Sequence, residues 1–332
     1  MRTLKPSTLK GLWSAILSPW GSDGKIDQGI LQRNCRKLAA ARVDGIYTTD
    51  SDGEFYAIEL GEFKDLARAF ARAIEPTGID AAIGVTWSHT QGIIDRIKAA
   101  CDAGIPNVHV AFPFFMPLAL ADIDRFFGDL AEAVPEARWI HYAHARCGPI
   151  LTGRDYARLS KHYPDQFIGT KIPTGDVSAL TEILANSEHL AHFICEYTIL
   201  PGILLGARGC YSYWVNVLPR WHRAFFDACL DGRWEAAAIY HKKLIKWERS
   251  GVQPLREAGH RHGIIGKARA ELTGWLEETG STRAPYTPVS KELRTRMKEA
   301  FDRYWADEIR QEDFGSPDFN NGTATQQQSA EN

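Results

Sequence analysis

The stretch AAIGVTWSHTQGIIDRIKAACDAGIPNVHVAF, residues 81–112, contains the pattern that decides the fold. It begins with a short apolar run at 81–86, continues with apolar residues at helical spacing over 90–104, and ends with a second apolar run at 107–112. Short apolar runs indicate buried strands, and helical spacing indicates an amphipathic helix. Gly104, followed by Ile105 and Pro106, is typical of a helix end. The stretch therefore predicts a strand–helix–strand unit with parallel strands.

The same alternation continues on both sides of this unit. We expect further strands at 11–18, 43–49, 138–143, 167–171, 192–196 and 208–213, and helices at 28–41, 63–74 and 121–134. The connection at 197–207 gives the weakest helical pattern. Eight strands with helical crossovers favour an α/β fold of the (βα)8 TIM-barrel type over an open sheet. Neither a P-loop nor a GxGxxG after the first strand is present, which removes two common reasons for an open sheet.

After the last predicted strand the pattern becomes purely helical. The helical stretches lie at 221–230, 234–248, 254–272 and 291–305. The sequence then ends in a polar, apolar-poor stretch. We therefore expect three parts: a barrel at 1–218, a C-terminal helical region at 219–308 and a mobile polar tail at 309–332.

Composition excludes several classes of protein. The chain has 332 residues, of which 44% are hydrophobic and 24% charged, as in globular proteins. Lys+Arg total 39 and Asp+Glu total 41, which disfavours a nucleic-acid partner. No apolar run approaches the roughly 18 residues of a membrane helix, and the first residues lack the apolar segment of a secretory signal. Six cysteines without a CxxC pair indicate reduced thiols in a cytoplasmic protein.

Lys171 is the strongest candidate for catalysis. It ends the predicted strand FIGTK and is the only lysine in any of the eight predicted strands. Active sites of this fold form at the carboxyl ends of the strands. A desolvated lysine amine there is a nucleophile that forms Schiff bases with carbonyl substrates. The alternative is a lysine that simply reaches solvent just past a strand.

Polar residues follow the neighbouring strands. Tyr142 ends the preceding strand and is placed to transfer a proton beside Lys171. Arg146, in the loop HARCG, can pair with a carboxylate. In the loop DSDGEF, Ser51, Asp52 and Gly53 offer hydroxyl and backbone N–H groups to an anion. Each of them also has an ordinary structural interpretation, as a rim aromatic, a solvated charge or a plain turn.

Together these motifs resemble the dihydrodipicolinate synthase / N-acetylneuraminate lyase family of class I aldolases, over roughly residues 8–300. The resemblance is carried by GLWSAILSP at 11–19, by DGI and GE between Asp44 and Glu54, and by AGIPNVHVAFPFF at 103–115. It continues in IHYAHARCG at 140–148, FIGTK at 167–171 and LGARGCYSYWVNVLP at 205–219.

The resemblance implies roles for individual residues. It implies that Lys171 forms the Schiff base, that Tyr142 is the catalytic tyrosine and that Arg146 binds a distal carboxylate. Ser51 and Asp52 fall on the pair of substrate-binding hydroxyl residues before GE. With Gly53, and with Tyr211 of the eighth strand, they complete the expected substrate site. The resemblance also implies a homotetramer built from dimers.

Three positions depart from the family pattern. Asp52 stands where a hydroxyl residue is usual, and its carboxylate would repel a substrate carboxylate unless protonated or turned away. Phe115, in the pair Phe114–Phe115, stands where the lysine-pathway enzymes usually have a relay tyrosine contributed across a subunit interface. Ala143 stands where asparagine is common. These departures favour a catabolic relative, with His141 and His144 as candidates to replace the lost polar groups.

A metal site is a weaker hypothesis. His141 and His144 are three residues apart, but His141 points away from Tyr142 if 138–143 is a strand. His260 and His262 fit a solvated polar stretch, and no third ligand has suitable spacing.

We therefore expect a Schiff-base lyase that acts on a 2-oxo acid such as pyruvate, without metal or cofactor. The first alternative is a dehydratase or deaminase of a hydroxylated 2-oxo acid, which would use the same lysine iminium. The second is a catalytically inactive barrel that binds a small acid.

Overall fold

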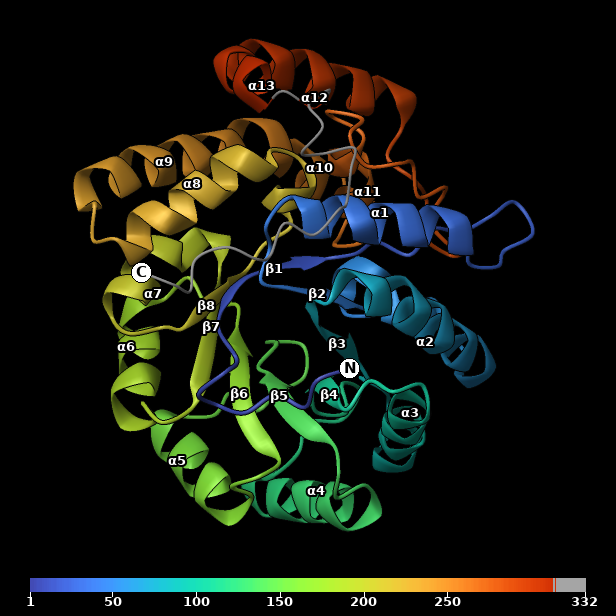
Figure 1. The fold of residues 1–332 in the computed structure, drawn as a ribbon, viewed down its shortest axis with the longest axis vertical. Helices are drawn as coiled ribbons and strands as arrows, with labels where there is room; N and C mark the ends of the chain where they lie inside the picture. The colour runs from blue at the N-terminus through green and yellow to red at the C-terminus, as the bar shows by residue number, and fades with distance from the viewer. Residues whose placement is uncertain (313, 315–332) are drawn as a thin grey trace, which may run out of the picture.

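The computed structural model describes residues 1–312 and 314, and its centre is a closed barrel surrounded by helices (Figure 1). Eight parallel strands pair in sequence order, and β8 pairs with β1 to close the ring. The predicted (βα)8 barrel is therefore confirmed. The strands are β1 (Gly11–Ala15), β2 (Gly45–Thr48), β3 (Asp80–Gly84), β4 (Asn107–Val110), β5 (Arg138–Tyr142), β6 (Phe167–Ile172), β7 (Ala191–Cys195) and β8 (Gly209–Tyr211).

A helix follows each strand, as the alternating pattern predicts. Asp27 and Thr152 begin two of these helices, because each side chain accepts a hydrogen bond from a backbone N–H of the first turn. The weak helical pattern at 197–207 corresponds to a 3-10 turn, η4 (Glu196–Thr198), and a short helix. The helices are α1 (Gln28–Ala40), α2 (Leu60–Ile74), α3 (Thr90–Asp102), α4 (Leu120–Ala133), α5 (Gly153–His162), α6 (Val177–Asn186), α7 (Ile199–Leu204) and α8 (Pro219–Leu230).

Apolar side chains fill the barrel below the carboxyl ends of its strands. The N-terminal segment closes the opposite end, where the Leu4 N–H donates to Asn107 Oδ1 at 2.9 Å. A second, larger apolar layer lies between the strands and the helices. The carboxyl end of the barrel is therefore where an active site can form. The interior cluster consists of Leu4, Leu9, Trp13, Ala15, Tyr47, Ala82, Ile140, Ile168, Ala191, Phe193 and Tyr211.

The C-terminal helices pack beside the barrel (Figure 1). The single helical stretch expected at 254–272 is divided in two, because Gly259 and Gly263 have left-handed backbones with φ of 92° and 68°. This break brings the segment around His262 to the barrel mouth. The elements are α9 (Trp234–Trp247), the π-helix η6 (Glu248–Val252), α10 (Gln253–Glu257), α11 (Ile264–Ala270), α12 (Lys291–Tyr304) and α13 (Ala306–Glu312).

The division at residue 218 remains a proposal. Residues 309–312, which we assigned to the tail, belong to α13, where Glu312 is buried and accepts the N–H groups of Arg220 and Trp221 at the start of α8. Apart from Phe314, the rest of the predicted tail lies outside the described residues.

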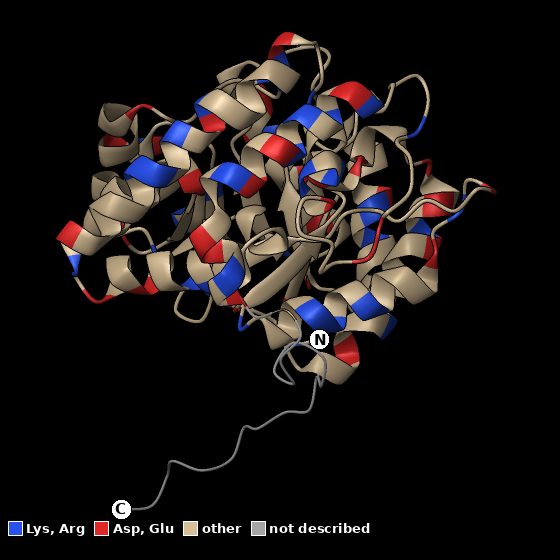
Figure 2. Cartoon of the chain, turned by 90° about the horizontal axis from the view of Figure 1, so that it is seen from above, with Lys and Arg blue, Asp and Glu red and all other residues tan. Residues whose placement is uncertain are grey.

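Basic and acidic residues are interspersed along the helices (Figure 2). Within residues 1–312 and 314, every helix is too short or too polar to cross a bilayer.

Candidate active site

Lys171 lies at the carboxyl end of β6, where its side chain is buried inside the barrel mouth. Parallel pairing of β5 and β6 places Tyr142 directly opposite it. The Lys171 Nζ lies 4.1 Å from the ring centroid of Tyr142 and 4.3 Å from that of Tyr47. A third ring, that of Tyr211, is 5.0 Å away. The amine therefore sits in a cage of tyrosine rings, whose electron-rich faces attract a cation.

Asp50 is the charged partner of Lys171, and the sequence analysis did not identify it. Its Oδ2 lies 2.9 Å from Lys171 Nζ, and its side chain is only 1% exposed. Burial raises the pKa of Asp50, but Lys171 and His109 outweigh burial and lower that pKa to about 2. Burial lowers the Lys171 pKa, but the Asp50 carboxylate holds it well above its ordinary value. The resting site therefore contains a buried ammonium–carboxylate pair.

His109 and Tyr211 extend this pair into a chain. His109 Nδ1 lies 2.7 Å from Asp50 Oδ2, and His109 Nε2 lies 2.9 Å from the Tyr211 hydroxyl. Burial keeps the His109 pKa below its ordinary value despite the neighbouring carboxylate. A neutral imidazole beside a carboxylate donates from Nδ1, so Nε2 accepts from the Tyr211 hydroxyl. Tyr211, expected to bind substrate directly, has its hydroxyl engaged by His109.

The loop after β2 positions the expected anion-binding residues. Ser51 begins the 3-10 turn η1 (Ser51–Gly53), and its Oγ lies 3.4 Å from the Tyr142 hydroxyl. The N–H of Gly53 donates to the Asp50 carbonyl at 3.0 Å, and the Gly53 carbonyl accepts from Ser18 Oγ at 2.7 Å. The Gly53 N–H and carbonyl are therefore engaged within the protein, and Ser51 is the group of this turn that faces Tyr142.

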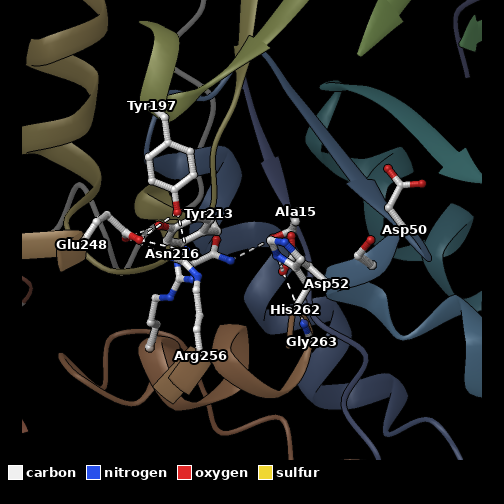
Figure 3. Close-up of polar contacts among 12 residues, drawn as sticks. Ala15, Asp50, Asp52, Tyr197, Tyr213, Asn216, Glu248, Arg256, His262 and Gly263 are labelled. Atoms are coloured by element: carbon white, nitrogen blue, oxygen red, sulfur yellow. Dashed lines mark hydrogen bonds and ion pairs between the residues drawn. The ribbon is translucent and has the colours of Figure 1, made fainter. Parts of the chain in front are cut away.

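Asp52 turns towards the C-terminal segment (Figure 3). Its Oδ1 lies 3.8 Å from His262 Nδ1 and accepts the Gly263 N–H at 3.5 Å. Asp52 is therefore turned towards His262 and Gly263, which is one of the two ways in which the expected repulsion of a substrate carboxylate would be relieved. That histidine was expected to be part of a solvated stretch, and its side chain is 41% exposed while lying opposite Asp52.

Arg146 lies exposed in the loop after β5, where its backbone N–H donates to His144 Nδ1 at 3.1 Å. Burial, with a contribution from Arg146, lowers the pKa of His144 to about 4, so His144 is neutral near pH 7. His141 is buried against Tyr156, whose hydroxyl lies 3.0 Å from its Nδ1. The two histidines therefore do not converge. Among the described residues, no three His, Cys, Asp or Glu side chains come together as metal ligands would.

A buried polar cluster around Glu248 attaches the C-terminal helices to the mouth (Figure 3). Glu248 accepts from the Tyr197 hydroxyl at 2.8 Å and from Arg256 Nη2 at 3.1 Å. It also accepts from the hydroxyl of Tyr213, whose ring lies 3.5 Å below the guanidinium carbon of Arg269. The cluster joins the loops after β7 and β8 to the π-helix, α10 and α11.

Glu196 is a second buried carboxyl that interacts electrostatically with Glu248 and Arg269 of this cluster. It directly follows β7 and is 3% exposed, and its Oε1 has no hydrogen-bond partner within the described part of the chain. Burial raises the pKa of Glu196 to about 8, so its carboxyl is neutral near pH 7. No sequence motif distinguished this residue from the other acidic residues.

Residues 8–303 match the model of the Dihydrodipicolinate synthetase family. The chain belongs to this family. It is therefore a lyase, and the resemblance inferred from its motifs is confirmed. It is 26% identical over 301 residues to the 4-hydroxy-tetrahydrodipicolinate synthase of Synechococcus sp. (strain WH7803), covering 89% of this chain and 95% of the relative. It is 25% identical over 291 residues to the synthase of that name from Methanosarcina mazei, covering 87% and 96%.

Solved structures of the family share the fold. YagE, a prophage protein of E. coli K12 in complex with pyruvate, aligns with a TM-score of 0.79 and 21% identity over 89% of this chain and 98% of its own. N-acetylneuraminate lyase from Fusobacterium nucleatum aligns with a TM-score of 0.76 and 19% identity over 90% and 99%.

Two departures from the family pattern have clear places in this structure. Phe115 lies in the loop between β4 and α4 and is 81% exposed, so it does not reach Lys171 within the same chain. Ala143 follows the last residue of β5, where its N–H donates to the Lys171 carbonyl at 3.0 Å. Neither side chain can carry a proton.

Glu248→Ala should lower the free energy of unfolding by about 3–5 kcal/mol, because Arg256 and Arg269 would lose their buried partner. Glu235, an exposed acid on α9, provides the control, and Glu235→Ala should change stability by about 0.5 kcal/mol or less. Urea unfolding followed by circular dichroism measures both. Equal effects of the two substitutions would contradict the anchoring role of Glu248.

Proposed function

We propose that this chain is a Schiff-base lyase that acts on a 2-oxo acid such as pyruvate, in a catabolic role and not in lysine biosynthesis. The observation that carries the proposal is Lys171, a buried amine at the carboxyl end of β6 inside a cage of tyrosine rings. Membership of the family supports the same chemistry.

The proposed reaction follows from the amine. Lys171 Nζ attacks the ketone carbon, a carbon–nitrogen bond forms and the ketone oxygen leaves as water. The resulting iminium becomes an enamine when it accepts the electron pair of the carbon–carbon bond one atom further along, while the hydroxyl on the departing carbon loses its proton and that fragment leaves as an aldehyde. A proton added to the enamine carbon restores the iminium. Water then hydrolyses the iminium, which frees the 2-oxo acid and restores the amine.

The neighbouring residues take the remaining roles. Burial raises the Tyr142 pKa to about 12, so its hydroxyl stays protonated and can donate to the carbinolamine oxygen. Ser51, 3.4 Å from that hydroxyl, binds the carboxylate next to the ketone, with Asp52 and Gly53 shaping the loop around it. Arg146 binds a distal anionic group from the loop after β5. Tyr211 completes the substrate site with its ring, 5.0 Å from Lys171 Nζ, while its hydroxyl is engaged by His109.

The catabolic role rests on the departures from the lysine-pathway pattern. Phe115 has no hydroxyl for a proton relay, and Asp52 brings a carboxylate to the substrate loop. We further propose a cytoplasmic homotetramer. The free thiols of all six cysteines support the location, and the exposed side chains of Phe115, Met116 and Leu120 support an interface between copies.

Borohydride should trap pyruvate, or another active 2-oxo acid, on Lys171, giving a mass shift on the peptide that contains FIGTK. Lys171→Arg should abolish trapping and turnover, because a guanidinium stays protonated. Lys161→Arg, an exposed substitution on α5, should leave both unchanged. The absence of an adduct with every 2-oxo acid tested would favour an inactive binding barrel instead.

Arg146→Ala should raise KM about 10- to 100-fold with little change in kcat, because one charged hydrogen bond to the substrate is lost. Arg154, exposed on α5, provides the matched control, and Arg154→Ala should leave KM unchanged. Steady-state kinetics with a substrate that has a distal anionic group measures both. If KM and kcat of Arg146→Ala equal those of the parent, Arg146 is only a solvated loop residue.

The enzyme should show negligible condensation of pyruvate with aspartate semialdehyde. General acid–base assistance is typically worth about 10²–10⁴ in rate, and Phe115 cannot supply it. The enzyme should also fail to restore growth of a bacterium that requires diaminopimelate. A kcat/KM of about 10⁴ M⁻¹s⁻¹ or more for this condensation would show that a water or His144 replaces the relay.

A further inference from the structure

Asp50 is held in place by an unusual local backbone. Thr49 has a left-handed φ of 68°, a conformation that β-branched residues rarely adopt, and its hydroxyl donates to the Gly84 carbonyl at 2.5 Å. Gly84 leaves the space that the carboxylate needs, since a Cβ there would lie 2.3 Å from Asp50 Oδ1. Backbone strain of this kind is concentrated at functional sites.

The contacts of Asp50 point to proton transfer. Its Oδ2 accepts from Lys171 Nζ at 2.9 Å and from His109 Nδ1 at 2.7 Å, while its Oδ1 has no partner among the described residues. The Tyr211 hydroxyl, 2.9 Å from His109 Nε2, fixes the imidazole from the other side. A carboxylate with only structural duties would normally have both oxygens satisfied when it is buried.

We propose that Asp50 accepts a proton from Lys171 Nζ when the Schiff base forms and then serves as the counter-ion of the iminium, with His109 and Tyr211 as positioning residues. This inference rests on the proposed function and deepens it.

The proton balance fits a single carboxylate. An ammonium and a ketone give an iminium and water, so two protons leave nitrogen and two reach the ketone oxygen. One proton passes from Nζ to Asp50 and then to the carbinolamine oxygen. The other N–H proton reaches the same oxygen through the Tyr142 hydroxyl, which donates its own proton and takes one from nitrogen. Asp50 begins and ends as an anion, so it is the counter-ion of the ammonium before the reaction and of the iminium after it.

The sign of the pH effect follows from the groups around Nζ. Burial raises the pKa of each neighbouring tyrosine and lowers that of each neighbouring histidine, so these groups are neutral near pH 7. Asp52 is directed at His262, which leaves Asp50 as the negative charge in contact with the amine. The titratable groups around Lys171 are Tyr47, Asp50, His109, Tyr142, His144, Tyr211 and His262, and Asp52 lies on the same loop as Asp50.

The test is the pH dependence of borohydride trapping with pyruvate, followed by mass spectrometry from about pH 7 to about pH 12, so that the range extends above the ordinary pKa of a lysine. Asp50→Asn should lower the pH of half-maximal trapping by about 1–3 units, because a buried amine without its counter-ion loses its proton more easily. Turnover should fall about 10²–10⁴-fold, because the proton carrier is gone. Asp52→Asn removes a charge from the same loop without touching Nζ, and should shift the midpoint by less than about half a unit.

Tyr211→Phe is a second, milder test in case Asp50→Asn does not fold, because it removes one hydroxyl and keeps the ring. It should shift the midpoint in the same direction by less than about one unit, because the Asp50 carboxylate is less firmly held. The role of Asp50 would be overturned if the midpoint were unchanged both in folded Asp50→Asn and in Tyr211→Phe. If Lys171 of the parent enzyme were still trapped, the proposed function would stand. A parent enzyme that is never trapped would overturn the proposed function as well.

Discussion

The buried pair of Lys171 and Asp50 is the interaction on which the site depends. An amine in an apolar barrel mouth is costly to ionise, and a carboxylate beside it is equally costly alone. The two groups lie 2.9 Å apart, surrounded by three tyrosine rings. Each therefore neutralises the charge of the other and gives it a hydrogen-bond partner. Breaking such a pair by removing one partner typically costs about 3–5 kcal/mol. The barrel thus keeps the proposed nucleophile and its carboxylate partner together in a largely buried site.

The rest of the structure holds this pair in a fixed geometry. Parallel pairing of β5 with β6 sets Tyr142 opposite Lys171, and closure of β8 on β1 brings Tyr211 under His109. The N-terminal segment fills the opposite end of the barrel. On the open side, Glu248 and its arginine partners fasten the helices after β8 to the loops of the mouth. The segment between α10 and α11 then supplies His262 and the Gly263 N–H, towards which the Asp52 carboxylate turns.

Much of this could be predicted from the sequence, because the alternating pattern is regular and parallel strands end at one edge of a sheet. That regularity predicted the closed barrel and placed Lys171 and Tyr142 at the same end. Asp50 could not be predicted, because the loop DSDGE contains three acidic residues and only the left-handed Thr49 selects the one that faces the lysine. His109 has the pattern of an ordinary strand residue. Glu248 accepts hydrogen bonds from Tyr197 and Tyr213, each of which lies more than thirty positions away in the sequence. Contacts of that separation are set by packing and leave no local pattern.

A crystal structure of the enzyme reduced with borohydride in the presence of pyruvate tests the central claim most directly. The account predicts continuous density from Lys171 Nζ to the former ketone carbon. It also predicts that Asp50 stays within hydrogen-bond distance of that nitrogen, with Tyr142 and Ser51 beside the substrate atoms. Pyruvate bound without a covalent bond, or attached to a different lysine while Lys171 and Asp50 remain paired, would contradict it.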